Sequence, residues 1–204
     1  GSAPAQINVP RDFWTQVIDI ELPEVIDIEK PSGGRSGIAR AADLLSNAKF
    51  PVILNGAGVV LSDAIPASAV LAEKLSAPVC CGYQHNDAFP GTHPLSVGPL
   101  GYNGSKAAME LIAKADVVLA LGTRLNPFST LPGYGVDYWP AKAKVVQVDI
   151  NPDRIGLTKK VSVAIQGDAK MVAEQLTEAL EPTAGDIGRE DRLALIQQTK
   201  SAWL

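Results

Sequence analysis

The residues best suited to bind an anion follow the first apolar stretch of the chain. Gly56-Ala-Gly58 comes directly after the run 51–55 and directly before a helical pattern. Backbone amides at such a turn can bind a diphosphate. The third glycine of the dinucleotide fingerprint is missing because Leu61 stands in its place, and Cys81-Gly82, rather than an acidic residue, ends the second apolar run. These departures disfavour a plain NAD site, and a simple tight turn remains the alternative.

Two charged side chains follow other apolar runs. Arg124 comes just after the run 116–121, and Asp149 ends the run 144–149. Arginine can bind phosphate through two parallel hydrogen bonds, and aspartate can accept hydrogen bonds from ribose hydroxyls. If both runs are parallel strands, these residues share the sheet edge where ligands bind. The pattern predicts a nucleotide-shaped groove, in use or ancestral; alternatively, Asp149 caps the turn through Pro152 and pairs with Arg124.

Further candidates lie in loops. The segment 98–104 brings three glycines, Gly101 among them, to a helix start. His85 and His93 share one loop and could serve acid–base chemistry, but no motif supplies a partner, which favours loop-stabilising hydrogen bonds. Cys80 and Cys81 are adjacent, so neither an unstrained disulfide nor a zinc site is expected.

The elements that must position these residues alternate between helix and strand. Apolar runs predict strands at 51–55, 78–81, 116–121, 144–149 and 161–165. Helical spacing follows residue 38, and Ser62, Ser105 and Asp168 are placed to begin further helices. The predicted fold is α/β: a doubly wound parallel sheet of five or six strands with helices on both faces.

The two ends of the chain differ from this core. Residues 1–30 are extended and acidic, as in a linker draped over a surface, and 31–183 form the central α/β domain. Residues 184–204 hold a linker with an amphipathic helix. We expect residues 1 to about 30 and 185–204 to pack less well than the core.

Composition narrows the function classes. The 204 residues are 46% hydrophobic and 20% charged, with a formal net charge of -4. This balance disfavours nucleic-acid binding, which needs a basic face. No uncharged apolar run approaches the ~20 residues of a membrane helix. A cytoplasmic, reduced location without a membrane partner is expected.

Several motifs occur in the order and spacing of a known family. They are Pro51-Val-Ile-Leu-Asn-Gly-Ala-Gly58, Phe89-Pro-Gly-Thr-His-Pro-Leu95, Gly98-Pro-Leu-Gly-Tyr-Asn-Gly104, Leu121-Gly-Thr-Arg124, Val148-Asp-Ile-Asn-Pro152 and Gly167-Asp-Ala169. Together they resemble the central domain of thiamine-diphosphate enzymes of the acetolactate synthase type, a domain with a DHS-like NAD/FAD-binding fold. The segments 81–90, 125–135 and 198–203 are similar to the sulfoacetaldehyde acetyltransferases of this group, and 6–12 resembles the segment that closes the pyrimidine-binding domain.

The resemblance implies one third of a larger, homo-oligomeric enzyme with two further domains on the same polypeptide. That enzyme would use thiamine diphosphate and Mg to convert sulfoacetaldehyde and phosphate into acetyl phosphate and sulfite, in taurine degradation. The activating glutamate and the Mg-binding Gly-Asp-Gly motif are absent, so the chain itself is expected to be inactive. Alternatives are an acetolactate synthase-like enzyme and a stand-alone, sirtuin-like nucleotide-binding module.

In flavin-containing relatives these strand ends bind the adenylate half of FAD. By position, the resemblance carries this role onto Gly56, Gly58, Gly101, Arg124, Asp149 and Asp168. No catalytic or metal-binding residue is implied in this chain. Tyr102 and the turn 125–128 depart from the flavin-binding pattern, and we expect them to fill the groove and leave it vestigial.

Overall fold

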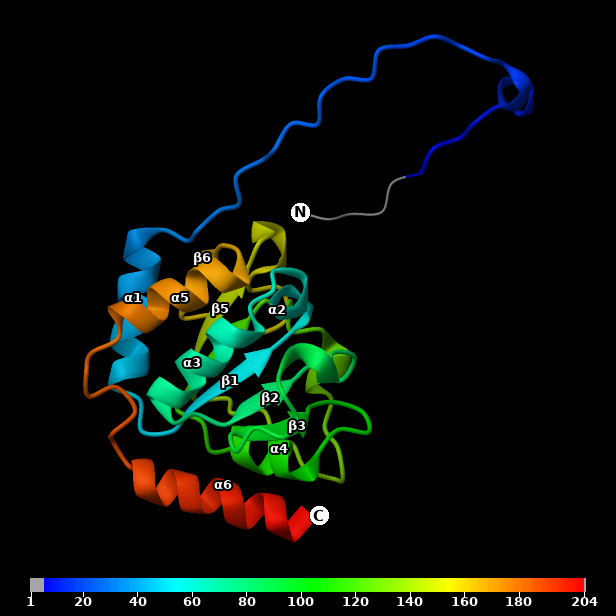
Figure 1. The fold of residues 1–204 in the computed structure, drawn as a ribbon. Coiled ribbons are helices and arrows are strands. Elements are labelled where there is room, and N and C mark those ends of the chain that lie inside the picture. Colours follow the sequence, from blue (N-terminus) through cyan, green and yellow to red (C-terminus); the bar gives the residue numbers. More distant parts are fainter. Residues whose placement is uncertain (1–5, 204) are drawn as a thin grey trace.

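The computed structural model describes residues 6–203, and its centre is a six-stranded, wholly parallel sheet (Figure 1). The strand order is β3-β2-β1-β4-β5-β6, so the order in which successive strands are added reverses between β1 and β4. The predicted fold class is confirmed. The strands are β1 (Pro51–Asn55), β2 (Val79–Cys81), β3 (Ser96–Pro99), β4 (Val117–Leu121), β5 (Lys144–Asp149) and β6 (Val163–Gln166). Strands β1 and β4 are buried throughout, as expected for the centre of a parallel sheet.

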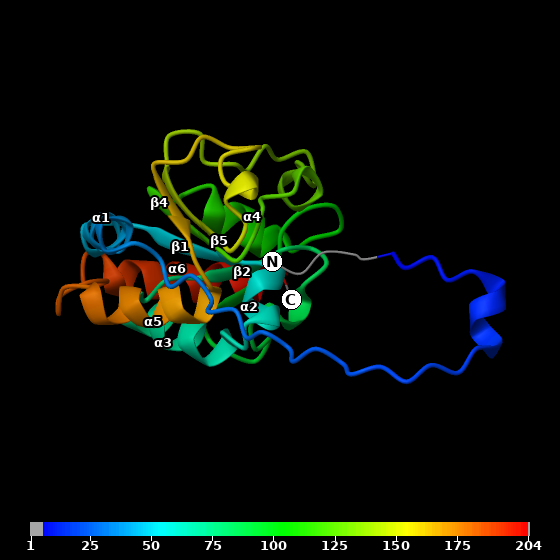
Figure 2. The same cartoon turned by 90° about the horizontal axis from the view of Figure 1, so that it is seen from above.

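Helices cover both faces of the sheet (Figure 2). Helices α3 (Ile65–Leu75) and α5 (Ala169–Ala179) pack together on one face, with α1 (Arg35–Ser46) beside α5 and against β6. Helix α4 (Lys106–Ile112) and the long loop 122–143, which contains the 3₁₀ turn η3 (Pro127–Thr130), lie on the other face. None of the helices within residues 6–203 is long and apolar enough to cross a membrane.

Two of the three expected helix starts are confirmed. The Ser105 hydroxyl accepts from the amide of Ala108 at 3.3 Å, and Asp168 accepts from two amides of α5. Ser62 was expected to begin a helix, but it follows the short helix α2 (Ala57–Leu61), and its hydroxyl donates to the Gly58 carbonyl. Pro66 is in the first turn of the following helix α3, where a missing amide costs no hydrogen bond.

The first described residues extend away from the domain (Figures 1 and 2). Every residue from 6 to 30 is exposed, including the 3₁₀ turn η1 (Arg11–Thr15). The segment does not lie along the surface of this domain. It joins the domain at residues 30–32, where Ser32 forms a β-bridge with Gly167.

Helix α6 (Arg189–Trp203) packs against the domain with part of its surface. It lies below the sheet, opposite the carboxyl ends of the strands, and contacts α4 (Figure 1). Arg192 and Ile196 are each only 1% exposed. Most residues from 186 to 202 are exposed, in agreement with the prediction that this region packs less well than the core, while Arg192 and Ile196 are buried where α6 closes the amino-terminal edge of the sheet.

Candidate functional site

A groove of about 800 Å³ lies at the carboxyl ends of β1, β4, β5 and β6. This volume falls within the range typical of small-molecule sites. Five of the six predicted site residues line it: Gly56, Gly58, Arg124, Asp149 and Asp168. The topology brings them together because the sheet reverses strand order between β1 and β4, which opens a crevice there.

Close packing against the turn after β4 explains why two of the residues after β1, Gly56 and Gly58, are glycine. A Cβ on Gly58 would lie 2.7 Å from the Cα of Gly122, and one on Gly56 would lie 2.4 Å from the Cβ of Thr123. The amide of Gly56 donates to the Leu121 carbonyl and that of Gly58 to the Gly122 carbonyl, at 3.0 and 2.8 Å. These two amides are therefore already bonded within the protein. The tight-turn interpretation accounts for both glycines.

The charged groups of the groove fall into bonded and unbonded sets. Asp149 Oδ1 accepts from the amide of Asn151 at 2.9 Å, so the expected turn through Pro152 is confirmed. The expected pairing of Asp149 with Arg124 is absent from the ion pairs of the described residues. Arg124 and Arg154 line the groove as exposed side chains, and neither guanidinium has a hydrogen-bond or ion-pair partner among residues 6–203. Two unpaired guanidinium groups suit a dianionic ligand.

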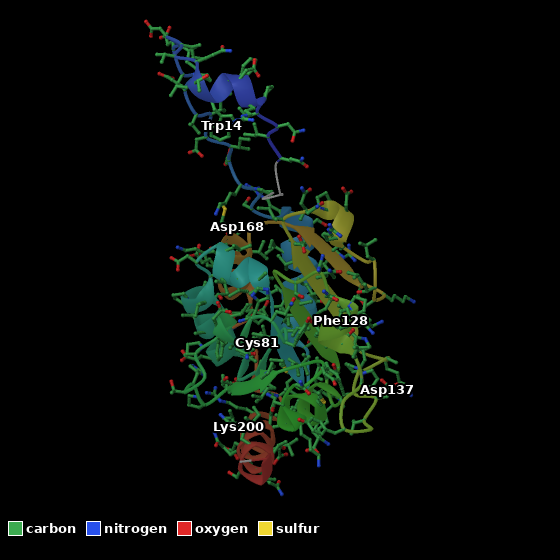
Figure 3. All side chains as sticks on the ribbon, turned by 90° about the vertical axis from the view of Figure 1, so that its right-hand side faces the viewer. Trp14, Cys81, Phe128, Asp137, Asp168 and Lys200 are labelled. Atoms are coloured by element: carbon green, nitrogen blue, oxygen red, sulfur yellow. The ribbon has the colours of Figure 1, made fainter. Side chains whose placement is uncertain are left out.

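Asp168 is 4% exposed and connects three parts of the structure. Its Oδ1 caps α5 by accepting from the amides of Lys170 and Met171 at 3.0 and 3.3 Å. Its Oδ2 lies 3.1 Å from Nζ of Lys30, where the N-terminal segment joins the domain (Figure 3). The carboxylate thus has a structural role in addition to its place in the groove wall.

The prediction that Tyr102 and Phe128 fill the groove is wrong. Tyr102 and Phe128 are 67% and 57% exposed, and neither lines the groove, which is open. Gly101, the sixth predicted residue, lies outside the groove lining as well. It has φ +94, and an added Cβ would lie 2.3 Å from the Phe128 carbonyl oxygen. Gly101 therefore allows the turn η3 to pack closely over the end of β3, which directs Phe128 to the surface instead of the groove.

Sequence reasoning missed two buried, hydrogen-bonded side chains, of which Gln147 holds two residues of the groove lining in place. Gln147 donates from Nε2 to the carbonyls of Thr123 and Arg154, and its Oε1 accepts from the amide of Gly156. Asn55 donates to Ser68 Oγ and to the Ala88 carbonyl. In the sequence, the signal for both is a polar residue within or at the end of an otherwise apolar strand. Such a side chain is buried only when it is hydrogen-bonded, so it indicates a bonded group in the interior.

The histidines and cysteines do not form a catalytic set. His93 Nε2 lies 3.2 Å from Glu73 Oε1, and its Nδ1 accepts from the amide of Leu95, which confirms a loop-stabilising role. His85 lines the groove. Burial raises the pKa of Cys80 and, helped by Asp87, raises the pKa of Cys81 to about 12, so both thiols stay protonated at neutral pH. Within residues 6–203, no three His, Cys, Asp or Glu side chains come together as a metal site.

Comparison with known proteins identifies the family. The family model described as "Thiamine pyrophosphate enzyme, central domain" matches residues 38–176. This chain belongs to that family. The family predicted from the motifs is thereby confirmed.

Individual relatives differ in their sequence identity to this chain. The chain is 74% identical, over its whole length, to a probable sulfoacetaldehyde acetyltransferase from Rhizobium meliloti strain 1021. It is 73% identical, over 99% of its length, to a sulfoacetaldehyde acetyltransferase from Roseovarius nubinhibens. A probable acetolactate synthase large subunit from Methanocaldococcus jannaschii is more distant, with 34% identity over 98% of the chain and 33% of that protein. The chain spans 34% of the length of each of the first two relatives.

A solved structure agrees with the observed fold. Benzoylformate decarboxylase from Polynucleobacter necessarius superposes with a TM-score of 0.67 and 21% identity, covering 83% of this chain and 32% of that one. At this identity the likeness concerns the fold.

Proposed function

We propose that this chain is the central domain of a sulfoacetaldehyde acetyltransferase, an enzyme that forms acetyl phosphate and sulfite from sulfoacetaldehyde and phosphate. The observation that carries the proposal is the 74% identity over the whole chain to a relative of that description, against 34% to an acetolactate synthase. Its partners would be two further domains of the same polypeptide, in a cytoplasmic homo-oligomer.

Thiamine diphosphate would bind outside this chain. When bound, it supplies a carbanion that attacks the aldehyde carbon, and it needs a divalent metal with oxygen ligands. The groove does not fit that requirement, because the carboxylate of Asp149 is used in its turn and that of Asp168 in its helix cap. We therefore assign no chemical step to the residues of this chain.

The test uses the full-length polypeptide that contains this sequence. Purified with thiamine diphosphate, Mg and phosphate, it is expected to release sulfite from sulfoacetaldehyde and to form acetyl phosphate. Conversion of pyruvate to acetolactate without sulfite release would instead assign it to the acetolactate synthases.

We also propose that the groove binds a nucleoside diphosphate such as ADP, with Arg124 on the diphosphate and Asp149 near the ribose. The open volume and the two unpaired arginines support this proposal. A charge-assisted contact contributes about 1.5–3 kcal/mol, so Arg124→Ala is expected to weaken ADP binding by about tenfold to a hundredfold in calorimetry.

Arg11→Ala is the matched control, because Arg11 is an exposed arginine on the N-terminal segment, remote from the groove lining. It should leave ADP affinity unchanged. No heat of binding for the wild-type chain at millimolar ADP or FAD would mean that the groove is vestigial.

A further inference from the structure

Residues 16–29 expose seven large apolar side chains along an extended stretch of chain. We call them the docking segment. They hold no helix or strand and extend away from the domain body in Figures 1 and 2, while Figure 3 places the neighbouring Trp14 far from the labelled residues of the domain. The exposed apolar residues are Val17 98%, Ile18 68%, Ile20 60%, Leu22 77%, Val25 97%, Ile26 83% and Ile28 81%.

The docking segment also carries charge of one sign. It contains five acidic residues, and no lysine, arginine or histidine occurs between residues 12 and 29. Apolar and acidic residues alternate in Ile18-Asp19-Ile20-Glu21-Leu22 and again in Ile26-Asp27-Ile28-Glu29. Because successive side chains of an extended chain point to opposite sides, each stretch has one apolar face and one acidic face.

Neither of the two hollows described in this chain matches such a segment. The groove at the carboxyl ends of the strands is lined largely by glycine and by polar and charged residues. A second hollow of about 480 Å³ lies between α3 and α5 and is partly apolar, with Pro66, Ala67 and Val70 in its wall. It is bordered by three carboxylates and one ammonium group, from Asp63, Glu174, Glu178 and Lys170. These carboxylates would repel an acidic segment. The docking segment of one copy is therefore not expected to bind in this hollow of a second copy.

We propose that the docking segment binds another part of the same polypeptide, in an apolar groove bordered by lysine or arginine side chains. Ile18, Ile20 and Leu22 would enter that groove together, and the acidic residues between them would face the basic border. The proposal rests on the proposed function, because about two thirds of the length of the closely similar relatives lies outside this chain. Burying side chains that are 60–98% exposed here would supply the main driving force.

Hydrogen exchange of the 204-residue chain and of the full-length polypeptide tests this. The amides of residues 16–29 are expected to exchange at least about tenfold more slowly in the full-length polypeptide, because exchange then requires undocking. This protection should decrease as NaCl is raised to about 1 M, where the Debye length falls to about 3 Å. Similarly fast exchange in both proteins overturns the proposal.

Variants locate the contact. Ile20→Asp and Ile26→Asp should each abolish the added protection in the full-length polypeptide and leave the Tm of the 204-residue chain unchanged. Leu157→Asp is the matched control, because Leu157 is an apolar residue 65% exposed on the folded domain, and it should leave the protection intact. A variant that fails to fold at full length leaves the wild-type comparison to decide.

Sedimentation of the 204-residue chain tests whether the docking segment binds a second copy of this chain instead. A dimer that Ile20→Asp dissolves would assign the docking segment to a second copy and overturn the proposal. Sulfite release is measured separately: a full-length polypeptide that protects the segment but releases no sulfite refutes the proposed function and leaves the docking intact.

Discussion

Charged residues divide by location into those that are fully bonded and those that are free to bind a ligand. Asp168 and Arg192 are buried and bonded, and within residues 6–203 every buried side-chain nitrogen or oxygen has a hydrogen-bond partner. Arg124 and Arg154, by contrast, are exposed in the groove and unpaired. Two unpaired guanidinium groups therefore lie together in the groove, while the buried charged groups are used within the fold.

The cysteine thiols make stability sensitive to alkaline pH. Folding raises the pKa of Cys81 from 9.0 to about 12, so between these values the unfolded state has lost a proton that the folded state retains. Stability is therefore unaffected by this thiol below pH 9 and falls as pH rises above it, by at most about 1.4 kcal/mol per pH unit. Urea unfolding of the wild type and of Cys81→Ala from pH 8 to 11 should show a shallower decline in the variant.

Cys80 and Tyr138 act in the same direction, since burial raises the pKa of both. Some alkaline decline should therefore persist in Cys81→Ala. Thiolate absorbance appearing in the folded wild type near pH 9 would contradict the prediction.

The carboxylate of Asp168 should contribute measurably to stability. In Asp168→Ala the first turn of α5 loses its cap and Lys30 loses its partner, and we expect a loss of about 1–2 kcal/mol in the free energy of unfolding. Asp137→Ala removes an exposed carboxylate and should change the same quantity by less than about 0.5 kcal/mol. Equal effects of the two substitutions would show that the cap is unimportant.

Among the elements, helix α6 is anchored to the strands by the buried side chain of Arg192. The Arg192 guanidinium donates to five carbonyls, those of Lys49, Leu75, Ser76, Gly185 and Ile187, at 2.5–3.0 Å. Lys49 and Ser76 precede β1 and β2, so the bonds fix α6 to the amino ends of two central strands. No carboxylate forms an ion pair with this buried cation within residues 6–203; backbone carbonyls accept its hydrogen bonds, and the charge of Asp116 favours its protonated form.

Arg192→Leu is expected to destabilise the chain by at least about 3 kcal/mol, because buried carbonyls lose their donor. Arg192→Lys keeps the charge but has three donors for five bonds, and about 2 kcal/mol should be lost. Arg189→Leu, at an exposed position on the same helix, is the control. Thermal unfolding that ranks the three variants differently would refute the proposed anchoring role.

The sequence predicted the elements whose signal is local and missed those set by packing. Strands β1, β4 and β5 were predicted because they are continuous apolar runs, and Ser105 and Asp168 because caps have a side-chain signature. Strand β3 contains glycine and proline, so only its pairing with β2 identifies it as a strand. The same distinction holds in the groove: its position follows from strand ends, whereas Gln147, Lys30 and the outward direction of Phe128 depend on contacts between distant segments.

At the scale of the whole molecule, the chain is a rigid domain with a long exposed segment. It spans 34% of the length of closely similar relatives and has no site that fits the metal-dependent cofactor among its described residues. The 204-residue chain alone is therefore expected to release no sulfite from sulfoacetaldehyde when thiamine diphosphate, Mg and phosphate are supplied. Sulfite above the no-protein background, in a colorimetric assay of the purified chain, would contradict this.

The contacts of the two terminal segments with the domain lie at diagonal corners of the sheet. The N-terminal segment joins at Lys30, beyond the carboxyl end of β6, whereas Lys200 of α6 donates to the Pro94 carbonyl, before the amino end of β3. A force applied at these two points would therefore be carried by the whole sheet. A pull between these two points would act along the strands and shear their ladders together, which resists more strongly than opening one bond at a time.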